Sequence, residues 1–152
     1  MHSYPIEQIV PHAHPMILID RLIDYSPDSA RCEVDIKPGI NFFDNARLSV
    51  PSYVGLEYLA QSIAAYANVQ KILNGEEVAL GFLVSARNYK ASVSEFPAGA
   101  KLITSVTKLF KEENGLSVFD CTITSNNDVI IETKINVFEP EDPSLFLSGE
   151  AK

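Results

Sequence analysis

The chain has 152 residues, of which 46% are apolar and 21% are charged, and this balance excludes the disordered and fibrous classes. Its length is that of one domain with a sizeable core, so a single domain over residues 1–152 is expected. The formal net charge of −8 disfavours nucleic acids and anionic membranes as partners, because both need a basic face.

The N-terminal part is predicted to hold one helical turn and two strands. Pro5 opens the turn in PIEQIV. Residues 1–12 lack the basic and apolar regions of a signal peptide, so a cytoplasmic protein is expected. MILIDRLIDY, from Met16, predicts a strand. In ARCEVDI, apolar residues from Cys32 to Ile36 alternate with charged residues, which is typical of a half-buried strand.

A long apolar helix is the main element of the middle of the chain. Residues 40–51 have no clean period and predict a loop, after which Pro51 opens a helix of about 20 residues. Asn74-Gly75 supplies a left-handed stop. The helix is apolar on nearly every side and should be buried, but its polar residues exclude a membrane span.

Four strands are predicted after the helix, in VALGFLVSARNYK, KLITSVTKLF, LSVFDCTITS and VIIETKINVF. In the last of them, alternate residues from Val129 to Val137 are expected to point inward. The tail, residues 139–152, is expected to be loosely ordered. This order of elements predicts an α+β fold with an antiparallel sheet. Strong curvature of the sheet, or a second subunit, would complete the burial of the helix.

Glu57 is the unusual residue of this helix. An ionised carboxylate inside an apolar helix is costly unless it is paired, hydrogen-bonded or beside a polar cavity. Gln61 follows four residues later on the same face and could orient the carboxyl group. Burial would favour the neutral form of Glu57 and suit it to proton transfer. A structural Glu satisfied by a neighbouring strand fits the spacing equally well.

Two cysteines and two histidines are the other candidate reactive groups. Cys32 and Cys121 lie far apart without metal-ligand spacing, which indicates reduced core thiols. His12 and His14, just before Pro15, are residues that can bind a metal or act as a general base. No neighbouring Cys or His completes a metal shell, so neither a metal nor a cofactor is expected.

The start of the helix offers backbone groups for binding. Free N–H groups at a helix N-terminus, together with the helix dipole, can polarise a carbonyl or stabilise an enolate oxygen. Ser52 and Tyr53 would supply such amides one to two turns before Glu57. Every helix has such an end, so this pattern does not identify a site by itself.

Three segments resemble the β-hydroxyacyl-(acyl carrier protein) dehydratases. PHAHPMILIDRL is similar to the family's opening pattern, Pro-His-x-x-Pro followed by apolar residues and Asp-Arg. VPSYVGLEYLAQ is similar to the central-helix segment, which ends in Glu, three residues and Gln, and GFLVSARNYKASVSEFPAGAKLI resembles the strands that follow. The match covers residues 9–110, and the branch it resembles most is the one linked to aryl polyene pigment pathways.

The resemblance implies a hotdog fold, in which an antiparallel sheet wraps around one long helix and two subunits pair. It implies a hydro-lyase that removes water from a 3-hydroxyacyl thioester to give the trans-2-enoyl thioester in fatty acid or polyene synthesis. The acyl group would arrive on acyl carrier protein or coenzyme A. The partner subunit would be a second copy or a paralogous hotdog chain.

The resemblance also assigns roles to single residues. Glu57 matches the catalytic carboxylate, Gln61 the Gln one turn later, and Ser52 the position whose backbone N–H binds the thioester oxygen. The family's catalytic His, in a Gly-His-Phe-Pro turn before the helix, has no counterpart in NFFDNARLSVPSY. His12 matches a second, non-catalytic His of the family, and His14 has no equivalent.

The source of the missing base stays open. His12 or His14 takes its place, a paralogous partner donates a His, or the chain binds acyl groups without converting them. A thioesterase of the same fold is an alternative, because such enzymes use a helix carboxylate without a paired His.

An acyl tunnel is expected beside the central helix. Chain length and head group cannot be read from its lining, and the default interpretation of each of these residues is plain core. The expected lining residues are Leu59, Ile63, Phe82 and Leu83.

Overall fold

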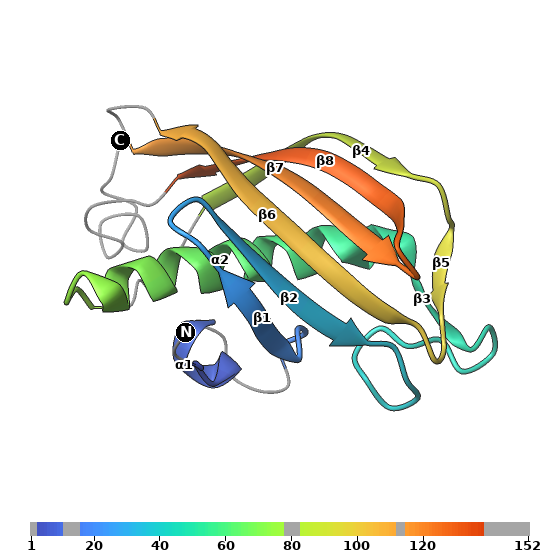
Figure 1. Cartoon of the computed structure of the whole chain (residues 1–152). Helices are drawn as coiled ribbons and strands as arrows, with labels where there is room; N and C mark the ends of the chain where they lie inside the picture. Colours follow the sequence, from blue (N-terminus) through green and yellow to red (C-terminus); the bar gives the residue numbers. More distant parts are fainter. Residues whose placement is uncertain (1–2, 11–15, 78–82, 112–114, 139–152) are drawn as a thin grey trace, which may run out of the picture.

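The computed structural model describes residues 3–10, 16–77, 83–111 and 115–138. The predicted loose tail, residues 139–152, lies outside this part of the chain. The helices are α1 (Ile6–Ile9), the 3-10 helix η1 (Ser52–Val54) and α2 (Gly55–Leu73). The strands, shown in Figure 1, are β1 (Arg21–Tyr25), β2 (Ser29–Asp35), β3 (Ser49–Pro51), β4 (Leu83–Ala91), β5 (Glu95–Pro97), β6 (Lys101–Lys111), β7 (Leu116–Ser125) and β8 (Asp128–Phe138).

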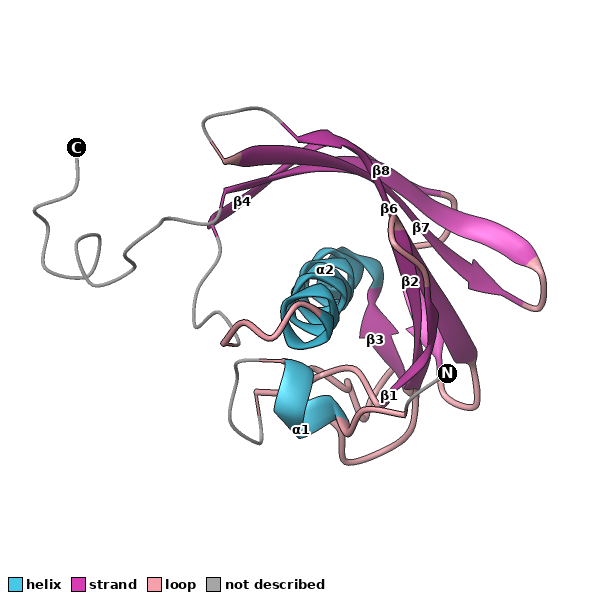
Figure 2. Cartoon of the chain, turned by 60° about the vertical axis from the view of Figure 1, so that its left-hand side comes forward, coloured by secondary structure: helices cyan, strands magenta, loops and turns pink. Residues whose placement is uncertain are grey.

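A six-stranded sheet covers one long helix. The strand order is β1-β2-β6-β7-β8-β4, and every neighbouring pair is antiparallel. The sheet curves around α2, as Figure 2 shows, and β3 and β5 form a separate two-stranded sheet near the start of the helix. The predicted α+β class and the predicted antiparallel sheet around the helix are therefore confirmed. Within the described ranges, no helix has both the length and the apolar character needed to cross a lipid bilayer.

The core lies between the concave face of the sheet and α2. In β7, Phe119, Cys121 and Ile123 are all buried while Asp120 is exposed, as the period of two predicts. Helix residues such as Leu59 meet these strands from the other side, and Leu59 has no exposed surface. The side-chain alternation of the strands and the apolar helix thus bury one shared core.

Both cysteines belong to this core, as predicted. Cys32 and Cys121 are free thiols with no exposed surface. Burial raises the pKa of Cys32 to about 11 and that of Cys121 to about 12. Both thiols should resist a disulfide reagent at pH 8 in the folded protein and react once guanidinium unfolds it.

The same shifts predict a loss of stability in alkali. The folded pKa of each thiol lies above its ordinary value, so the stabilisation is complete below about pH 8.5 and is lost as the pH rises towards the folded pKa. Denaturation midpoints measured from pH 8 to pH 11 should fall less in the Cys121→Ala variant than in the wild-type protein. An equal fall in both would contradict the assignment of Cys121.

Two predicted boundaries differ from the structure by more than one residue within the described ranges. The strand expected from Met16 begins only at Arg21, because the backbone of Met16 and Leu18 hydrogen-bonds to the side chain of Gln61 instead of to a strand. The loop expected over residues 40–51 ends in β3, which pairs with β5 and was not predicted. Three-residue strands are too short to give a readable period.

The alternation predicted for the last strand holds only from Ile131 onwards. Ile123 pairs with Ile131, but the next residue, Thr124, pairs with Val129, so Ile130 is an extra residue in β8. Val129 is consequently 49% exposed rather than buried. A β-bulge changes which face a side chain occupies, and an all-apolar sequence does not reveal it.

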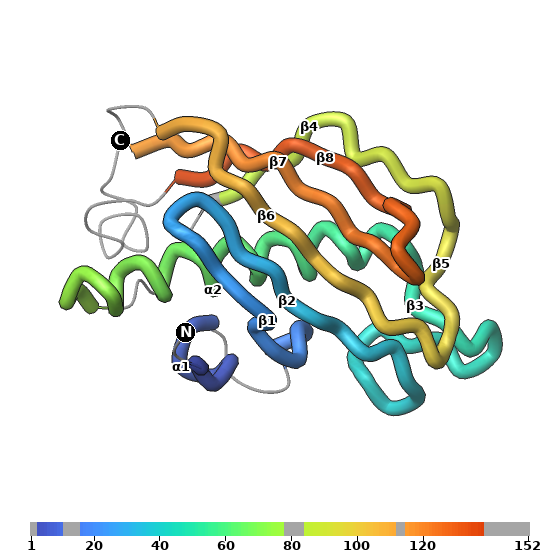
Figure 3. The backbone as a smooth tube through the Cα atoms, in the orientation of Figure 1, coloured from blue at the N-terminus to red at the C-terminus, as the bar shows by residue number. Residues whose placement is uncertain are grey.

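The central helix has the predicted extent. η1 and α2 together run from Ser52 to Leu73, and Gly75 follows with a φ of +74°, the left-handed stop expected there. The chain passes directly from β3 into this helix, as the tube in Figure 3 shows, and Pro51 is the residue at the junction. Pro51 has an extended conformation, with φ −59° and ψ 141°, so it precedes the helix instead of forming its first turn.

Candidate active site

Glu57 lies in the first turn of α2, where the helix dipole favours a negative charge. In the single chain its side chain is exposed, so the prediction that the fold buries this carboxylate is wrong. Its neighbours Tyr58 and Leu59 are buried, which means that only one narrow face of the helix reaches solvent here. Tyr53, four residues earlier, is 71% exposed. An exposed carboxylate and an exposed aromatic residue are therefore four positions apart at the start of a mostly buried helix.

Gln61 holds the Glu57 carboxyl group in place. Its Nε2 donates to Glu57 Oε1 at 3.2 Å and to the carbonyl oxygen of Met16 at 2.8 Å, and its Oε1 accepts from the Leu18 N–H at 2.8 Å. The predicted orienting contact is confirmed. Gln61 is only 1% exposed and uses both amide protons within the chain, so it fits a positioning role better than the expected substrate contact.

Replacing Gln61 with leucine should destabilise the protein by about 3 kcal/mol, because the Leu18 N–H and the Met16 carbonyl would lose their partner. Gln70→Leu is the matched control. It removes a single bond, from Gln70 Nε2 to the Ser26 carbonyl, and should cost about 1 kcal/mol. Urea denaturation midpoints compare the two variants. Equal losses would mean that Gln61 does not anchor the 16–18 segment.

The amide predicted to bind a substrate oxygen is already occupied. The Ser52 N–H donates to the Ser94 carbonyl at 3.0 Å, so the expectation that Ser52 offers a free amide is wrong. Within the described residues, the Tyr53 N–H donates to no backbone group outside the helix. Tyr53 is the second residue of η1, and the first N–H groups of a helix have no partner within it. Of the two predicted amides, that of Tyr53 therefore remains the candidate.

Sequence reasoning missed Tyr89, which reaches the start of the helix from β4. Its hydroxyl donates to the Ser52 carbonyl at 2.7 Å. Gly55 makes this contact possible, because a Cβ at that position would lie 2.4 Å from the Tyr89 hydroxyl oxygen. The available signal was Asn88, since Asn within a strand often marks a bulge that redirects the next side chain.

The loop before the helix presents large apolar side chains to solvent. Phe42 and Leu48 are 54% and 58% exposed, and both have left-handed backbone conformations, with φ of 70° and 53°. This conformation costs about 1–3 kcal/mol for a bulky residue and persists only where the surroundings impose it. Asp44 and Ser49 close the turn that contains Leu48 by exchanging backbone hydrogen bonds at 2.7 and 3.3 Å, and the Phe43 N–H closes the turn that contains Phe42 by donating to the Ile40 carbonyl at 3.2 Å. The exposed side chains thus belong to a well-braced loop.

The candidate bases His12 and His14 lie outside the described residues. The remaining histidine of the chain, His2, does so too, and the described part therefore contains no imidazole. His14 precedes Met16 by two residues in the sequence.

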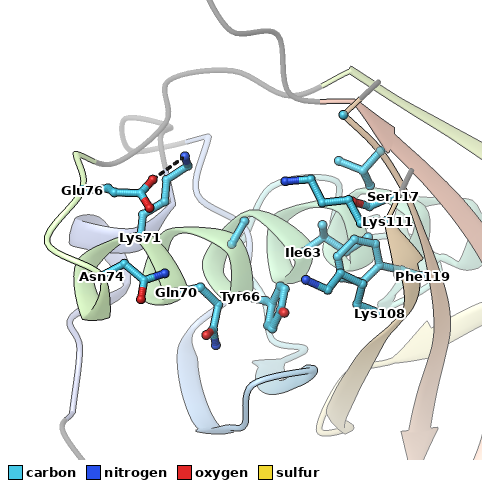
Figure 4. A pocket seen from close by; sticks show the side chains of 13 residues that line it. Ile63, Tyr66, Gln70, Lys71, Asn74, Glu76, Lys108, Lys111, Ser117 and Phe119 are labelled. Carbon is cyan, nitrogen blue, oxygen red and sulfur yellow. Dashed lines mark ion pairs between the residues drawn. The ribbon is translucent and has the colours of Figure 1, made fainter. Parts of the chain in front are cut away.

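The residues expected to line a tunnel do not lie together around one cavity in the described part of the chain. Leu59 is fully buried in the core, whereas Ile63 lines a cavity of about 230 Å³ between the C-terminal half of α2 and strands β6–β8. Figure 4 shows the lysines that surround this cavity, and Glu57 is not among its lining residues. Phe82 and the side chain of Leu83 lie outside the described part. The lysines are Lys71, Lys108 and Lys111.

Solved structures of other proteins share this fold. One chain of "The Dehydratase Heterocomplex ApeI:P from Xenorhabdus doucetiae" superposes with a TM-score of 0.89 and 19% identity, covering 99% of this chain and 100% of that one. The HP0420 homologue from Helicobacter felis gives a TM-score of 0.64 at 12% identity, over 93% of this chain and 94% of that chain. The architecture is therefore the hotdog fold.

Two sequence comparisons give the family. A curated relative, the 3-hydroxyacyl-[acyl-carrier-protein] dehydratase FabZ of Pseudothermotoga lettingae, is 32% identical over 78 residues, which is 51% of this chain. The alignment spans only 55% of that relative's length. The family model described as "ApeP-like: ApeP dehydratase" matches residues 4–148, nearly the whole sequence. The chain therefore belongs to the ApeP-like dehydratase family, within the FabZ-related hotdog proteins.

Proposed function

We propose that this chain is the carboxylate-bearing subunit of a heteromeric dehydratase that converts a 3-hydroxyacyl thioester to the trans-2-enoyl thioester. The observation that carries the proposal is an exposed Glu57 carboxylate, oriented by Gln61, in a chain whose loop before the central helix, residues 41–53, contains no His. Glu57 supplies one of the groups that the reaction needs, and a second subunit is proposed to supply the base.

The reaction needs a base, an acid and a donor for the thioester oxygen. A base removes a proton from C2, the negative charge moves towards the thioester oxygen, and the C3–O bond breaks while an acid protonates the leaving hydroxyl group, which departs as water. Glu57 is proposed to give this proton. The Tyr53 N–H, four residues earlier at the start of the helix, is proposed to meet the thioester oxygen.

A partner subunit that covers the exposed Glu57 carboxylate would enable it to act as a proton donor. Covering Glu57 removes water from it, and desolvation favours the neutral form that can donate a proton. Tyr53, Phe42 and Leu48 offer the partner more than half of their side-chain surface each. Large exposed apolar residues on a braced surface are typical of interfaces.

The sheet edge at β4 is a second place for a partner. β4 pairs with β8 on one side only, and most of its described residues are exposed, including Val84 at 44%. Proteins normally cover a long exposed edge strand or pair it with another chain. The similarity to a chain of a dehydratase heterocomplex, over 99% of this chain, favours a paralogous partner over a second copy.

The partner is proposed to supply the His that acts as base. His12 and His14 remain the intramolecular alternative. The proposal is tested by expressing the chain alone, with a His-bearing paralogous hotdog subunit, and with a variant of that subunit whose His is replaced by Ala. Each preparation is incubated with a 3-hydroxyacyl thioester, carried once on acyl carrier protein and once on coenzyme A, and formation of the enoyl product is followed.

We expect turnover only when this chain is combined with the wild-type His-bearing subunit, and in neither of the other two preparations. Activity of the chain by itself, abolished by His14→Ala or His12→Ala, would instead place the base within this chain. A partner that is equally active without this chain would make the chain a non-catalytic subunit. Release of free thiol and carboxylic acid would identify a thioesterase.

A further inference from the structure

We infer that Tyr89 is a positioning residue of the acyl site, which fixes the start of the central helix so that the Tyr53 N–H is the donor left for the thioester oxygen. The inference rests on the proposed function. It adds to the site a residue from strand β4, which lies outside both the central helix and the loop before it. It is carried by the hydrogen bonds of Ser52, the close approach at Gly55 and the irregular course of β4.

The first observation is a β-bulge that turns Tyr89 inward. Arg87 pairs with Lys134 and Lys90 with Glu132, so Asn88 and Tyr89 both lie opposite Thr133 alone. Asn88 has a φ of 51°, a left-handed conformation that Asn tolerates better than most residues.

The bulge gives Tyr89 a different exposure from its neighbours in β4. Of residues 84–91, all are exposed except Tyr89, which packs against the core. The Thr133 hydroxyl donates to the Arg87 carbonyl at 2.8 Å and fastens the bulge to β8. Bulges commonly redirect a side chain next to a functional site.

The second observation is that both backbone groups of Ser52 are held from outside the helix. The Tyr89 hydroxyl donates to its carbonyl at 2.7 Å, and its N–H donates to the Ser94 carbonyl at 3.0 Å. Burial raises the pKa of Tyr89 to about 12, so the hydroxyl stays protonated and remains a donor at neutral pH. The Gly55 N–H also donates to the Ser52 carbonyl. Ser52 is thus fixed by three hydrogen bonds, two of them from outside the helix, and the next amide along the chain, that of Tyr53, takes its direction from this fixed residue.

The third observation is the space reserved for Tyr89. A Cβ at position 55 would lie 2.4 Å from the Tyr89 hydroxyl oxygen, 2.9 Å from Ile123 Cδ1 and 3.2 Å from Phe96 Cζ. Gly55 therefore lets the hydroxyl pass over the helix to reach Ser52. Neither the bulge nor the glycine is needed for an ordinary strand packed on an ordinary helix, and together they bring one hydroxyl group to one carbonyl.

The test is Tyr89→Phe, with Tyr66→Phe as the matched control, both in the assembled protein. Tyr66 also donates its hydroxyl to a backbone carbonyl, that of Pro27 at 2.6 Å, but it does so from the C-terminal half of the same helix. Tyr89→Phe should lower kcat about 10-fold with KM changed less than about twofold, whereas Tyr66→Phe should leave kcat within about twofold of wild type.

Amide hydrogen exchange supplies a readout that does not depend on turnover. The Ser52 N–H should exchange at least about 10-fold faster in Tyr89→Phe than in wild type, and at the wild-type rate in Tyr66→Phe. Unchanged exchange at Ser52, or equal losses of kcat in the two variants, would overturn the inference. A wild-type assembly without dehydratase activity would remove the proposed function, while the exchange data would still decide whether Tyr89 fixes the start of the helix.

Discussion

Replacing Glu57 with glutamine is expected to lower dehydration by the assembled protein about 10²–10⁴-fold, because the amide keeps the shape of the side chain but cannot transfer the proton. Gln61 should still orient the new side chain through its contact at position 57, which is 3.2 Å in the wild-type protein. Circular dichroism and the denaturation midpoint should match those of the wild type. Steady-state kinetics with a 3-hydroxyacyl thioester measures the loss.

Glu76→Gln is the control for this variant. Glu76 lies just beyond the other end of α2, its side chain is 56% exposed, and it pairs with Lys71 at 3.6 Å. An exposed ion pair of this kind contributes little to stability, and this variant should keep full activity. Undiminished turnover in Glu57→Gln would show that another group transfers the protons, and equal losses in both variants would indicate a general effect of charge.

Replacing Gly55 with alanine is expected to destabilise the protein by about 2 kcal/mol or more, although alanine normally favours a helix over glycine by about 1 kcal/mol. The reversal follows from the 2.4 Å approach of the Tyr89 hydroxyl and the 2.9 Å approach of Ile123 Cδ1. Combining Gly55→Ala with Tyr89→Phe removes the nearer atom, and the double variant should recover part of the loss. Urea denaturation of the wild type, both single variants and the double variant gives the coupling energy.

Gly39→Ala separates the steric effect from the backbone effect. No atom lies within 4 Å of a Cβ at position 39, where φ is +93°, so the cost there comes from the left-handed backbone alone and should be about 1 kcal/mol. A Gly55→Ala protein as stable as the wild type would mean that the helix start can move away from Tyr89. The hydrogen bonds that hold Ser52 would then not fix the direction of the Tyr53 N–H.

The periodicity of apolar residues correctly predicted the central helix and the buried strands, because their apolar side chains must face the core. The apolar run that ends at Leu73, and the left-handed stop at Gly75, are local features that tertiary contacts did not override. The inward residues of β7 were predicted for the same reason, since strand geometry places every second side chain on one face.

The state of single polar groups was not predictable in this way. Glu57 was expected to be buried because its helix is apolar, yet the one face of the helix start that the sheet leaves uncovered includes it. The Ser52 amide was expected to be free because helix starts leave donors over, yet a carbonyl 42 positions later in the chain occupies it. Such contacts depend on segments distant in sequence, and local propensity carries no information about them.

The position of the Glu57 carboxyl group relative to a bound substrate analogue decides most directly whether this carboxylate transfers a proton. A crystal structure of the assembled heteromer with a 3-hydroxyacyl pantetheine amide would show it. We expect a Glu57 carboxyl oxygen within about 3.2 Å of the analogue's C3 hydroxyl oxygen, with an imidazole from the partner near C2. A Glu57 carboxyl group facing bulk solvent, more than about 8 Å from the acyl chain, would contradict it, because direct proton transfer requires contact.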